Sequence, residues 1–287
     1  MNHAYGHRLL NDPRKLMGYV ASRLDRDTIT DGWIKAIEDG VQESAVLFLL
    51  TQCRTAPSQK PELCLLLTKR SHRVVQPGDL CCPGGGIALA DKIISGFIPL
   101  PIAPVHGWFR WFRWLAKRGR PAHHVMQAWV AGLRESWEEL RLNPLRASLL
   151  GPLPVQQLVL FKRLIFPLAA WVPADPHLKP NKEVSRIVKV PLRSLLDQSN
   201  YGRYRLSFEY NGVAIDRRNE FPCFIHHGRR GTEILWGATF RITMDFLRIA
   251  FGFCCPDVDT LPVVRGRRDP TYFNGSVWDS ETNFDSK

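Results

Sequence analysis

The sequence predicts an α/β protein, and three observations support this prediction. Continuous apolar runs at 44–50, 63–68 and 164–172 are typical of strands that are buried on both faces of a sheet. Helical patterns lie between and after these runs, most clearly over 125–140. A hydrophobic content of 45% and a charged content of 23% are ordinary for a globular chain. At 287 residues, the chain can form one large domain with additions or two modest domains.

The chain begins with a predicted helical extension over residues 1–43. Asp12 is placed to cap a helix whose first residue is Pro13, because proline is tolerated where no amide hydrogen is needed. The strands at 44–50 and 63–68 follow, joined by a polar loop, and we expect them to pair.

The second half of the chain alternates between strands and helices. Asn143 and Pro144 are expected to end the helix over 125–140. The later predicted elements are strands at 164–172 and 187–191, a short helix at 192–196, a hairpin turn at Asn211–Gly212, and a helix that opens at 232–239 and runs to Phe251. The tail over 256–287 is polar and poorly periodic, so it is predicted to be loosely ordered.

An acidic stretch in the predicted helix over 125–140 is the first candidate for a functional site. Glu135, Glu138 and Glu139 stand at i, i+3 and i+4, so their carboxylates share one helix face. Like charges at these spacings destabilise a helix by a few tenths of a kcal/mol per pair, roughly, and Arg134 offsets only part of this. An all-oxygen set suits Mg²⁺, Mn²⁺ or Ca²⁺ rather than zinc. The alternative is a solvated acidic surface.

A glycine-rich turn lies upstream of the acidic stretch. Pro83 is followed by three glycines, which exclude a regular helix or strand interior. Such a turn lets the backbone approach a phosphate, a metal-bound ligand or another strand closely.

Residues 92–127 differ in composition from the rest of the chain. No acidic residue occurs between Asp91 and Glu135, whereas basic residues are frequent, and tryptophans alternate with arginines over Trp108–Trp114. This pattern is typical of an interfacial segment or a stacking surface, so the segment is a candidate for peripheral membrane or acyl-chain contact. Alternatively, the aromatic rings cover a gap in the core while the cations reach outward.

The net charge and the cysteines indicate which partners and which cellular compartment the protein has. A net charge of +12 favours anionic partners such as phosphorylated metabolites, nucleic acid or membrane, although nothing identifies a nucleic-acid-binding fold. Seven cysteines, an odd number that includes two adjacent pairs, argue against a disulfide framework and for a reducing cytoplasm. The start lacks the shape of a signal peptide, and no apolar run reaches the roughly 18 residues of a membrane span. We therefore expect a cytoplasmic protein, and a homodimer is left open.

Gly85, Asp91 and the stretch Arg134–Leu142 together resemble a Nudix box that has been split. The family's pattern is Gly, five residues, Glu, seven residues, then Arg-Glu-U-x-Glu-Glu-x-Gly-U, where U is bulky and apolar. Asp91 stands six residues after Gly85, in the place of the first Glu. The spacer from Asp91 to Arg134 is much longer than seven residues, so 92–127 is an insertion inside the box. Arg141 replaces the usual Gly.

The flanking sequence resembles one branch of that family, the coenzyme A diphosphatases. The segment 66–71, followed by Gly78 and by Pro83–Gly85, is similar to the extra signature of this branch. Gln76 stands where the branch usually has His, and Cys82 where it usually has Phe. The predicted Nudix domain covers 44–255.

The resemblance implies an α/β/α sandwich around a mixed β-sheet, and hydrolysis of the diphosphate of coenzyme A, acyl-CoA or a related nucleotide derivative. It implies Mg²⁺ or Mn²⁺ as the cofactor. The roles it implies are metal binding by Glu135, Glu138 and Glu139, base catalysis by Glu135 or Glu183, orientation of the carboxylates by Arg134, and substrate contact by Lys69, Arg70, Gly84 and Gly85.

A second hypothesis is a non-catalytic or regulatory Nudix-like module that holds an anionic partner or a membrane surface through its basic, aromatic insertion. Asp91, Arg141 and the insertion depart from the family pattern and motivate this alternative. None of these departures removes a carboxylate of the acidic helix, so an enzyme is the favoured interpretation.

Overall fold

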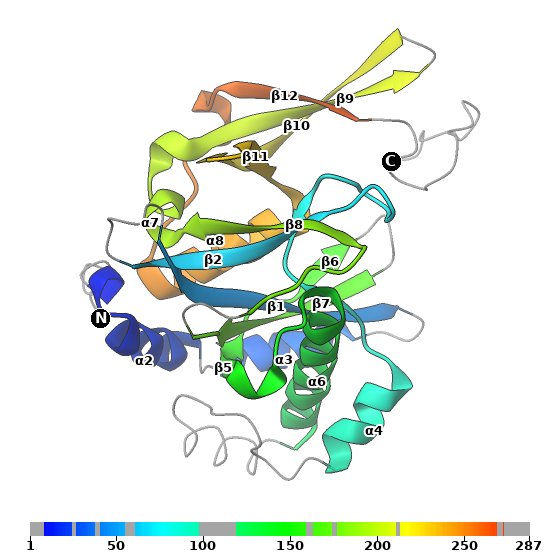
Figure 1. Cartoon of the computed structure of the whole chain (residues 1–287), viewed down its shortest axis with the longest axis vertical. Coiled ribbons are helices and arrows are strands. Elements are labelled where there is room, and N and C mark those ends of the chain that lie inside the picture. The colour runs from blue at the N-terminus through cyan, green and yellow to red at the C-terminus, as the bar shows by residue number, and fades with distance from the viewer. Residues whose placement is uncertain are drawn as a thin grey trace.

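A mixed eight-stranded sheet, here called the central sheet, forms the middle of the protein (Figure 1). The computed structural model describes residues 9–24, 27–37, 41–54, 61–97, 119–158, 163–173, 177–210, 213–268 and 272. The strands are β1 (Gln42–Cys53), β2 (Glu62–Arg70), β3 (Leu80–Cys81), β4 (Gly84–Gly86), β5 (Ser148–Pro152), β6 (Gln156–Leu158), β7 (Arg163–Trp171) and β8 (Val184–Pro191). β1 pairs antiparallel with β2 and β4 and parallel with β7, so the predicted pairing of the first two strands is confirmed.

Helices cover both faces of the central sheet. α2 (Pro13–Leu24) and α8 (Gly237–Phe251) pack on one face, and α3 (Asp27–Ala36) and α6 (Arg120–Leu140) pack on the other. The side chains of β1 alternate between the two faces and so contribute to both hydrophobic cores. Phe48 and Leu50 pack in the first core, and Leu47 and Leu49 pack in the second. The predicted α/β/α sandwich around a mixed sheet is therefore confirmed.

The N-terminal helices belong to these two cores. Asp12 Oδ1 accepts a hydrogen bond from the amide of Lys15 at 3.2 Å, as expected for the residue that precedes Pro13. Leu16 of α2 is fully buried in the first core. Trp33 of α3 is buried in the second core, and its Nε1 donates to Leu153 O at 2.7 Å.

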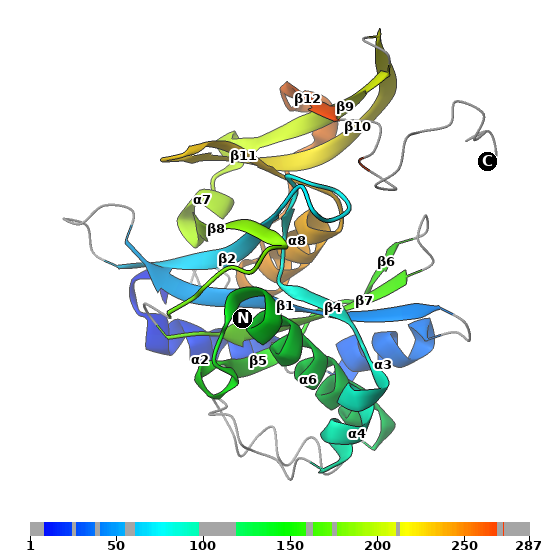
Figure 2. The same ribbon diagram turned by 45° about the vertical axis from the view of Figure 1, so that its right-hand side comes forward.

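A second, four-stranded sheet, here called the small sheet, lies over the end of the central sheet that is remote from α6 (Figures 1 and 2). Its strands run in the order β11-β10-β9-β12, with bounds β9 (Tyr201–Tyr210), β10 (Val213–Gly228), β11 (Gly231–Leu235) and β12 (Val263–Arg268). Val213 pairs with Tyr210, so the hairpin predicted at Asn211–Gly212 is confirmed, although those two residues lie outside the described part.

Two predictions in this region were wrong. Residues 232–235 form β11 rather than the opening of a helix, and α8 begins only at Gly237. The reason is pairing with β10, which buries Leu235 in the core. In the tail, Val263–Arg268 forms β12 along β9 and Tyr272 is buried, so these residues are ordered. Apart from Tyr272, the predicted tail from residue 269 onward lies outside the described residues.

A buried ion cluster ties the small sheet to the central sheet. Glu233 of β11 is 4% exposed and accepts from Lys69 Nζ of β2 at 2.9 Å. The same carboxylate pairs with Arg186 of β8. Cations from two strands of the central sheet thus neutralise one carboxylate from the small sheet, and this fixes how the two sheets meet.

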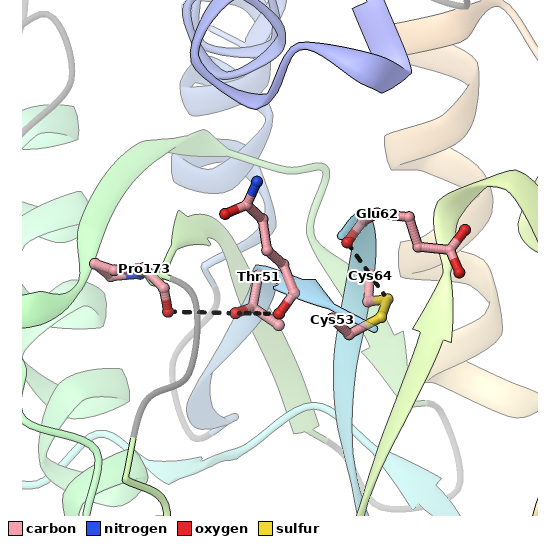
Figure 3. Close-up of a disulfide and its surroundings, with 6 residues drawn as sticks. Thr51, Cys53, Glu62, Cys64 and Pro173 are labelled. Atoms are coloured by element: carbon pink, nitrogen blue, oxygen red, sulfur yellow. Dashed lines mark hydrogen bonds between the residues drawn. A yellow bond between two sulfur atoms is a disulfide. The ribbon is translucent and has the colours of Figure 1, made fainter. Parts of the chain in front are cut away.

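A disulfide joins the far ends of β1 and β2 (Figure 3). Cys53 and Cys64 are 11 residues apart, but the antiparallel pairing brings their Cα atoms to 6.1 Å. This single bond was not anticipated from the cysteine pattern, which argues against a disulfide framework. The remaining described cysteines are free.

The acidic helix and the insertion also differ from expectation. α6 begins at Arg120, five residues before the predicted start, and residues 89–97 form α4 (Leu89–Phe97). Residues 98–118, including Trp108–Trp114, lie outside the described residues. The short α7 (Leu192–Leu195) follows β8 as predicted. Within the described ranges, no helix has both the length and the apolar character that a membrane crossing requires.

We predict that Glu233→Gln lowers the free energy of unfolding by about 3 kcal/mol, the lower end for a broken buried ion pair. The expected loss lies at the lower end of this range because the side chains of Lys69 and Arg186 are 27% and 26% exposed, so water can hydrate their charges in the variant. Urea unfolding monitored by circular dichroism measures the change. Glu220→Gln is the matched control, since the partners of Glu220, Arg203 and Arg205, lie in the small sheet itself. An equal loss in both variants would contradict the special role of Glu233.

Candidate functional site

A buried ion pair between Asp91 and Arg134 joins the two halves of the split motif. The two residues are 43 positions apart, and Asp91 is fully buried. Arg134 Nε donates to Asp91 Oδ1 at 2.9 Å, and its Nη2 donates to Asp91 Oδ2 at 3.0 Å. Asp91 Oδ2 also accepts from the amide of Ala88 at 2.8 Å. The shorter carboxylate of Asp thus reaches both partners, and a bidentate pair of this kind fixes orientation as well as distance.

The glycine turn lies directly against the acidic helix. Arg134 Nη2 donates to Gly86 O at 3.0 Å, and a Cβ placed on Gly85 would lie 2.4 Å from the Glu135 carboxylate. Gly84 has φ +151°, and a Cβ there would meet Ala45 O at 2.2 Å. The close approach of backbone that the sequence predicted therefore takes place here, with the carboxylate of Glu135 on one side and β1 on the other.

Among the carboxyl groups of the site, that of Glu139 lies where its charged form is most disfavoured. Burial raises the pKa of its carboxyl to about 8, with a further increase from neighbouring Glu135 and Glu183. Arg70 and a backbone hydrogen bond from Gly84 oppose this increase. Glu139 Oε2 is buried and has no hydrogen-bond partner among the described residues. A buried carboxylate oxygen without a donor is a rare arrangement that a cation would satisfy.

Glu135 shares this environment. Burial raises the pKa of the Glu135 carboxyl, while the Arg134 guanidinium, whose Nη1 lies 3.0 Å from Glu135 Oε1, lowers it. Arg134 itself has a raised pKa, first because of its hydrogen bond with Asp91, so it stays charged. The guanidinium therefore holds Glu135 at the turn, whereas Glu139 has no cation in contact among the residues that the structure describes.

Glu138 lies apart from the other two carboxylates. Its side chain is 53% exposed, and Oε1 lies 3.2 Å from Arg134 Nη1. Across the described ranges, no three His, Cys, Asp or Glu side chains are gathered closely enough to hold a metal ion. Metal binding by the three carboxylates together therefore stays a prediction, and Glu138 is the one of the three that is most exposed and paired with Arg134.

The C-terminal end of α6 is held in two ways. Arg141 adopts the left-handed conformation with φ +56°, and its amide donates to Trp137 O at 2.9 Å. It therefore ends the helix in the conformation that glycine usually takes there, at a cost of roughly 1 kcal/mol. The amides of Lys179 and Asn181 donate to Leu140 O and Glu139 O at 2.7 and 2.8 Å.

The loop that caps α6 also places Glu183, a predicted base. The amide of Glu183 donates to Asn181 Oδ1 at 2.8 Å, and its carbonyl accepts from Ser71 N at 2.8 Å. The Glu183 side chain is exposed, and it is close enough to raise the pKa of Glu139. Asn181 was not anticipated from the sequence, although Pro180-Asn181 is a turn signal that marks such a loop.

The two cations predicted for substrate contact have different surroundings. Arg70 is near enough to lower the pKa of Glu139 through its charge, and its Nε donates to Val75 O at 2.7 Å. The ammonium of Lys69 is engaged by Glu233, on the side of the small sheet. Of these two cations, Arg70 is therefore the one that lies near Glu139 and is not paired with Glu233.

The residues present fit a hard divalent cation. Glu135 and Glu139 supply carboxylate oxygens, Glu139 Oε2 lacks a donor, and the Gly84–Gly86 backbone is close to both. Mg²⁺ in particular retains several water ligands and needs only one or two carboxylates. Such a cation would also relieve the repulsion that raises the pKa of Glu139.

No protein-family model matches the chain, and no curated protein matches its sequence. Several solved structures are similar to it. One is a Caenorhabditis elegans Ap4A hydrolase complex, which is 12% identical to this chain and has a TM-score of 0.33. The matched region covers 52% of this chain and 80% of the Ap4A hydrolase chain. A NUDIX hydrolase from Alicyclobacillus acidocaldarius is 14% identical, with 56% and 83% covered and a TM-score of 0.34. The NUDIX domain of Shewanella oneidensis NrtR, complexed with ADP ribose, is 13% identical, with 58% and 85% covered and a TM-score of 0.31. Likenesses of this size say nothing about what the present chain binds or cleaves.

We predict that the metal-free protein loses stability as the pH rises from about 4.5 to about 8. The pKa of Glu139 is about 8 in the folded protein against an ordinary value of 4.5, so over this window the unfolded chain has released a proton that the folded chain keeps. Glu139→Gln removes this loss and should be more stable than the wild type at pH 8, by on the order of 2 kcal/mol. Thermal unfolding in EDTA measures both.

The same experiment with Mn²⁺ tests the cation site. At pH 8, Mn²⁺ should raise the Tm of the wild type and change that of Glu139→Gln much less. Glu138→Gln is the control and should keep the pH dependence of the wild type. A flat wild-type profile, or an equal gain from Mn²⁺ in Glu139→Gln, would contradict the assignment.

Proposed function

We propose that the protein is a metal-dependent pyrophosphohydrolase of the Nudix type, acting on the diphosphate of coenzyme A, acyl-CoA or a related nucleotide derivative. The observation that carries the proposal is the meeting of Gly85 with Glu135 and of Asp91 with Arg134 across the insertion. These contacts bring together the residues on which the resemblance to a split Nudix box rests. The resemblance of 66–71 and 83–85 to the coenzyme A branch supports the choice of substrate.

The side chains divide the work in the following way. Mg²⁺ or Mn²⁺, when bound, neutralises the diphosphate and stabilises the charge that builds on the leaving oxygen. Glu135 and Glu139 hold the cation, and Arg134 keeps Glu135 in place. Arg70 binds a phosphate oxygen of the substrate near Glu139.

Glu183 is our choice of general base. Its side chain is exposed beside Glu139, so it can accept the proton of an attacking water and return it to solvent. Glu135 is less suited, because it is packed against Gly85 and paired with Arg134.

The proposal predicts that coenzyme A incubated with Mg²⁺ or Mn²⁺ yields adenosine 3′,5′-bisphosphate and a phosphopantetheine. Chromatography of the products over a panel of coenzyme A species and dinucleotides measures this. Gly85→Ala should lower kcat by about 100-fold or more, because the added Cβ displaces Glu135.

Gly86→Ala is the matched control, since nothing lies within 4 Å of a Cβ at Gly86. It should retain kcat within about threefold of the wild type. Absence of turnover with either metal over the whole panel would refute the proposed function. Equal activity of the two alanine variants would refute the role of Gly85.

A membrane or acyl-chain contact is a second candidate function, and one observation favours it. α4 exposes three apolar side chains, Leu89, Ile93 and Ile94, by 73%, 53% and 46%, and it overlaps the first residues of the insertion over 92–127. Monomeric proteins rarely expose a contiguous apolar patch without a partner.

We expect the protein to float with vesicles that contain anionic lipid, and Leu89→Ser with Ile93→Ser to reduce the bound fraction several-fold. Deletion of residues 97–120 should lower activity on acyl-CoA more than on free coenzyme A. Equal effects on the two substrates, together with no flotation, would rule this function out.

A further inference from the structure

The loop that joins β2 to β3, residues 71–79, holds Arg70 by its backbone and by its side chain. The amide of Arg70 donates to Asp79 O at 2.9 Å. Arg70 Nε donates to Val75 O at 2.7 Å. The guanidinium that lies near Glu139 is therefore placed by the shape of this loop.

The loop contains backbone conformations that most residues avoid. Gln76 has φ +56°, in the left-handed region, and Gly78 has φ +81°. Glycine adopts such angles readily, whereas a residue with a side chain does so where surrounding contacts hold it. A contact from outside the loop is therefore expected at Gln76.

Tyr272, from the C-terminal part of the chain, supplies this contact. Its carbonyl accepts a hydrogen bond from the amide of Gln76 at 2.9 Å. Its hydroxyl donates to the carboxylate of Asp79, 193 residues away in the sequence. The two bonds thus engage the loop at its left-handed residue and at the residue whose carbonyl holds Arg70.

Tyr272 is itself anchored in the small sheet. Its side chain is fully buried and packs in one hydrophobic cluster with Tyr204 and Leu206 of β9 and with Cys223 of β10. β12, which ends at Arg268, pairs with β9 along its whole length. The small sheet therefore provides a fixed base from which Tyr272 contacts the loop.

We propose that Tyr272 is a positioning residue, which holds the 71–79 loop in the shape that presents Arg70 to a phosphate of the substrate. The inference rests on the proposed function, in which Arg70 binds that phosphate, and it extends the site to the C-terminal part of the chain. Tyr272 acts through Arg70 rather than on the substrate itself. Loss of its hydroxyl lowers the fraction of molecules whose loop is ready to bind, and the apparent affinity falls by that fraction.

Tyr272→Phe tests the hydroxyl, because the ring and the carbonyl are retained. KM for coenzyme A should rise about fivefold or more while kcat stays within about twofold, since Arg70 binds the phosphate equally before and during the reaction. Tyr201→Phe is the matched control, because it removes another buried hydroxyl of the small sheet, which donates to Leu195 O at 2.6 Å. Both variants should lose roughly 2–4 °C in Tm, but Tyr201→Phe should leave KM unchanged. A rise of KM in both variants, or in neither, would overturn the inference.

A double variant tests whether Tyr272 acts through Arg70. When Tyr272→Phe is added to Arg70→Gln, KM should stay within about twofold of that of Arg70→Gln alone, because the group that Tyr272 positions is already absent. A further rise of about fivefold in the double variant would show that Tyr272 acts by another route, and the inference would be wrong.

Nuclear magnetic resonance of the Arg70 Nε–H group separates this inference from the proposed function, because it requires no turnover. Loss of the signal in Arg70→Gln assigns it. The hydrogen bond to Val75 O should protect this proton from exchange with water, and Tyr272→Phe should speed the exchange by about tenfold or more, whereas Tyr201→Phe should not. If the exchange responds in this way but the wild type hydrolyses no member of the panel, the proposed function fails and the hold of Tyr272 on Arg70 stands. If the wild type hydrolyses coenzyme A but its exchange equals that of Tyr272→Phe, the function stands and the inference fails.

Discussion

The ion pair between Asp91 and Arg134 is the interaction on which the candidate site depends. It is bidentate, it involves a fully buried carboxylate, and it joins α4 to α6 across 43 residues. The same guanidinium contacts Gly86 O and the carboxylate of Glu135, so one side chain holds the glycine turn and the acidic helix together. A long insertion is compatible with this arrangement, because the entropy of closing a loop grows only slowly with its length once the ends are fixed.

Burial and mutual repulsion disfavour the charged carboxylates of the site, and neighbouring residues keep these carboxylates in place. Glu139 is held in a position where burial and two nearby carboxylates oppose its ionisation. Backbone hydrogen bonds from Lys179 and Asn181 fix the end of α6. Such a strained, unsatisfied group is typical of functional sites, where binding of a ligand recovers the free energy that folding gives up.

Local patterns predicted most of the fold, and pairing between distant strands explains what they missed. The apolar runs identified β1, β2 and β7, and Asn211–Gly212 identified the hairpin, because these signals act over a few residues. β11 and β12 were missed, since a short strand is defined by its partner rather than by its own sequence. In the site, the resemblance to a split Nudix box placed Gly85 and Glu135 in one motif, and the two residues lie against each other. The pairing of Lys69 with Glu233, 164 residues away, and the outward turn of Glu138 depend on tertiary structure and could not be predicted.

The central claim is that Glu135, which Arg134 holds beside Gly85, forms a divalent cation site together with Glu139. Anomalous diffraction from crystals grown with Mn²⁺ tests this claim most directly. The account predicts one strong anomalous peak within coordination distance of a carboxylate oxygen from each of these two residues, and loss of the peak in Glu139→Gln. A peak elsewhere, or none while both side chains keep the positions described here, would contradict it.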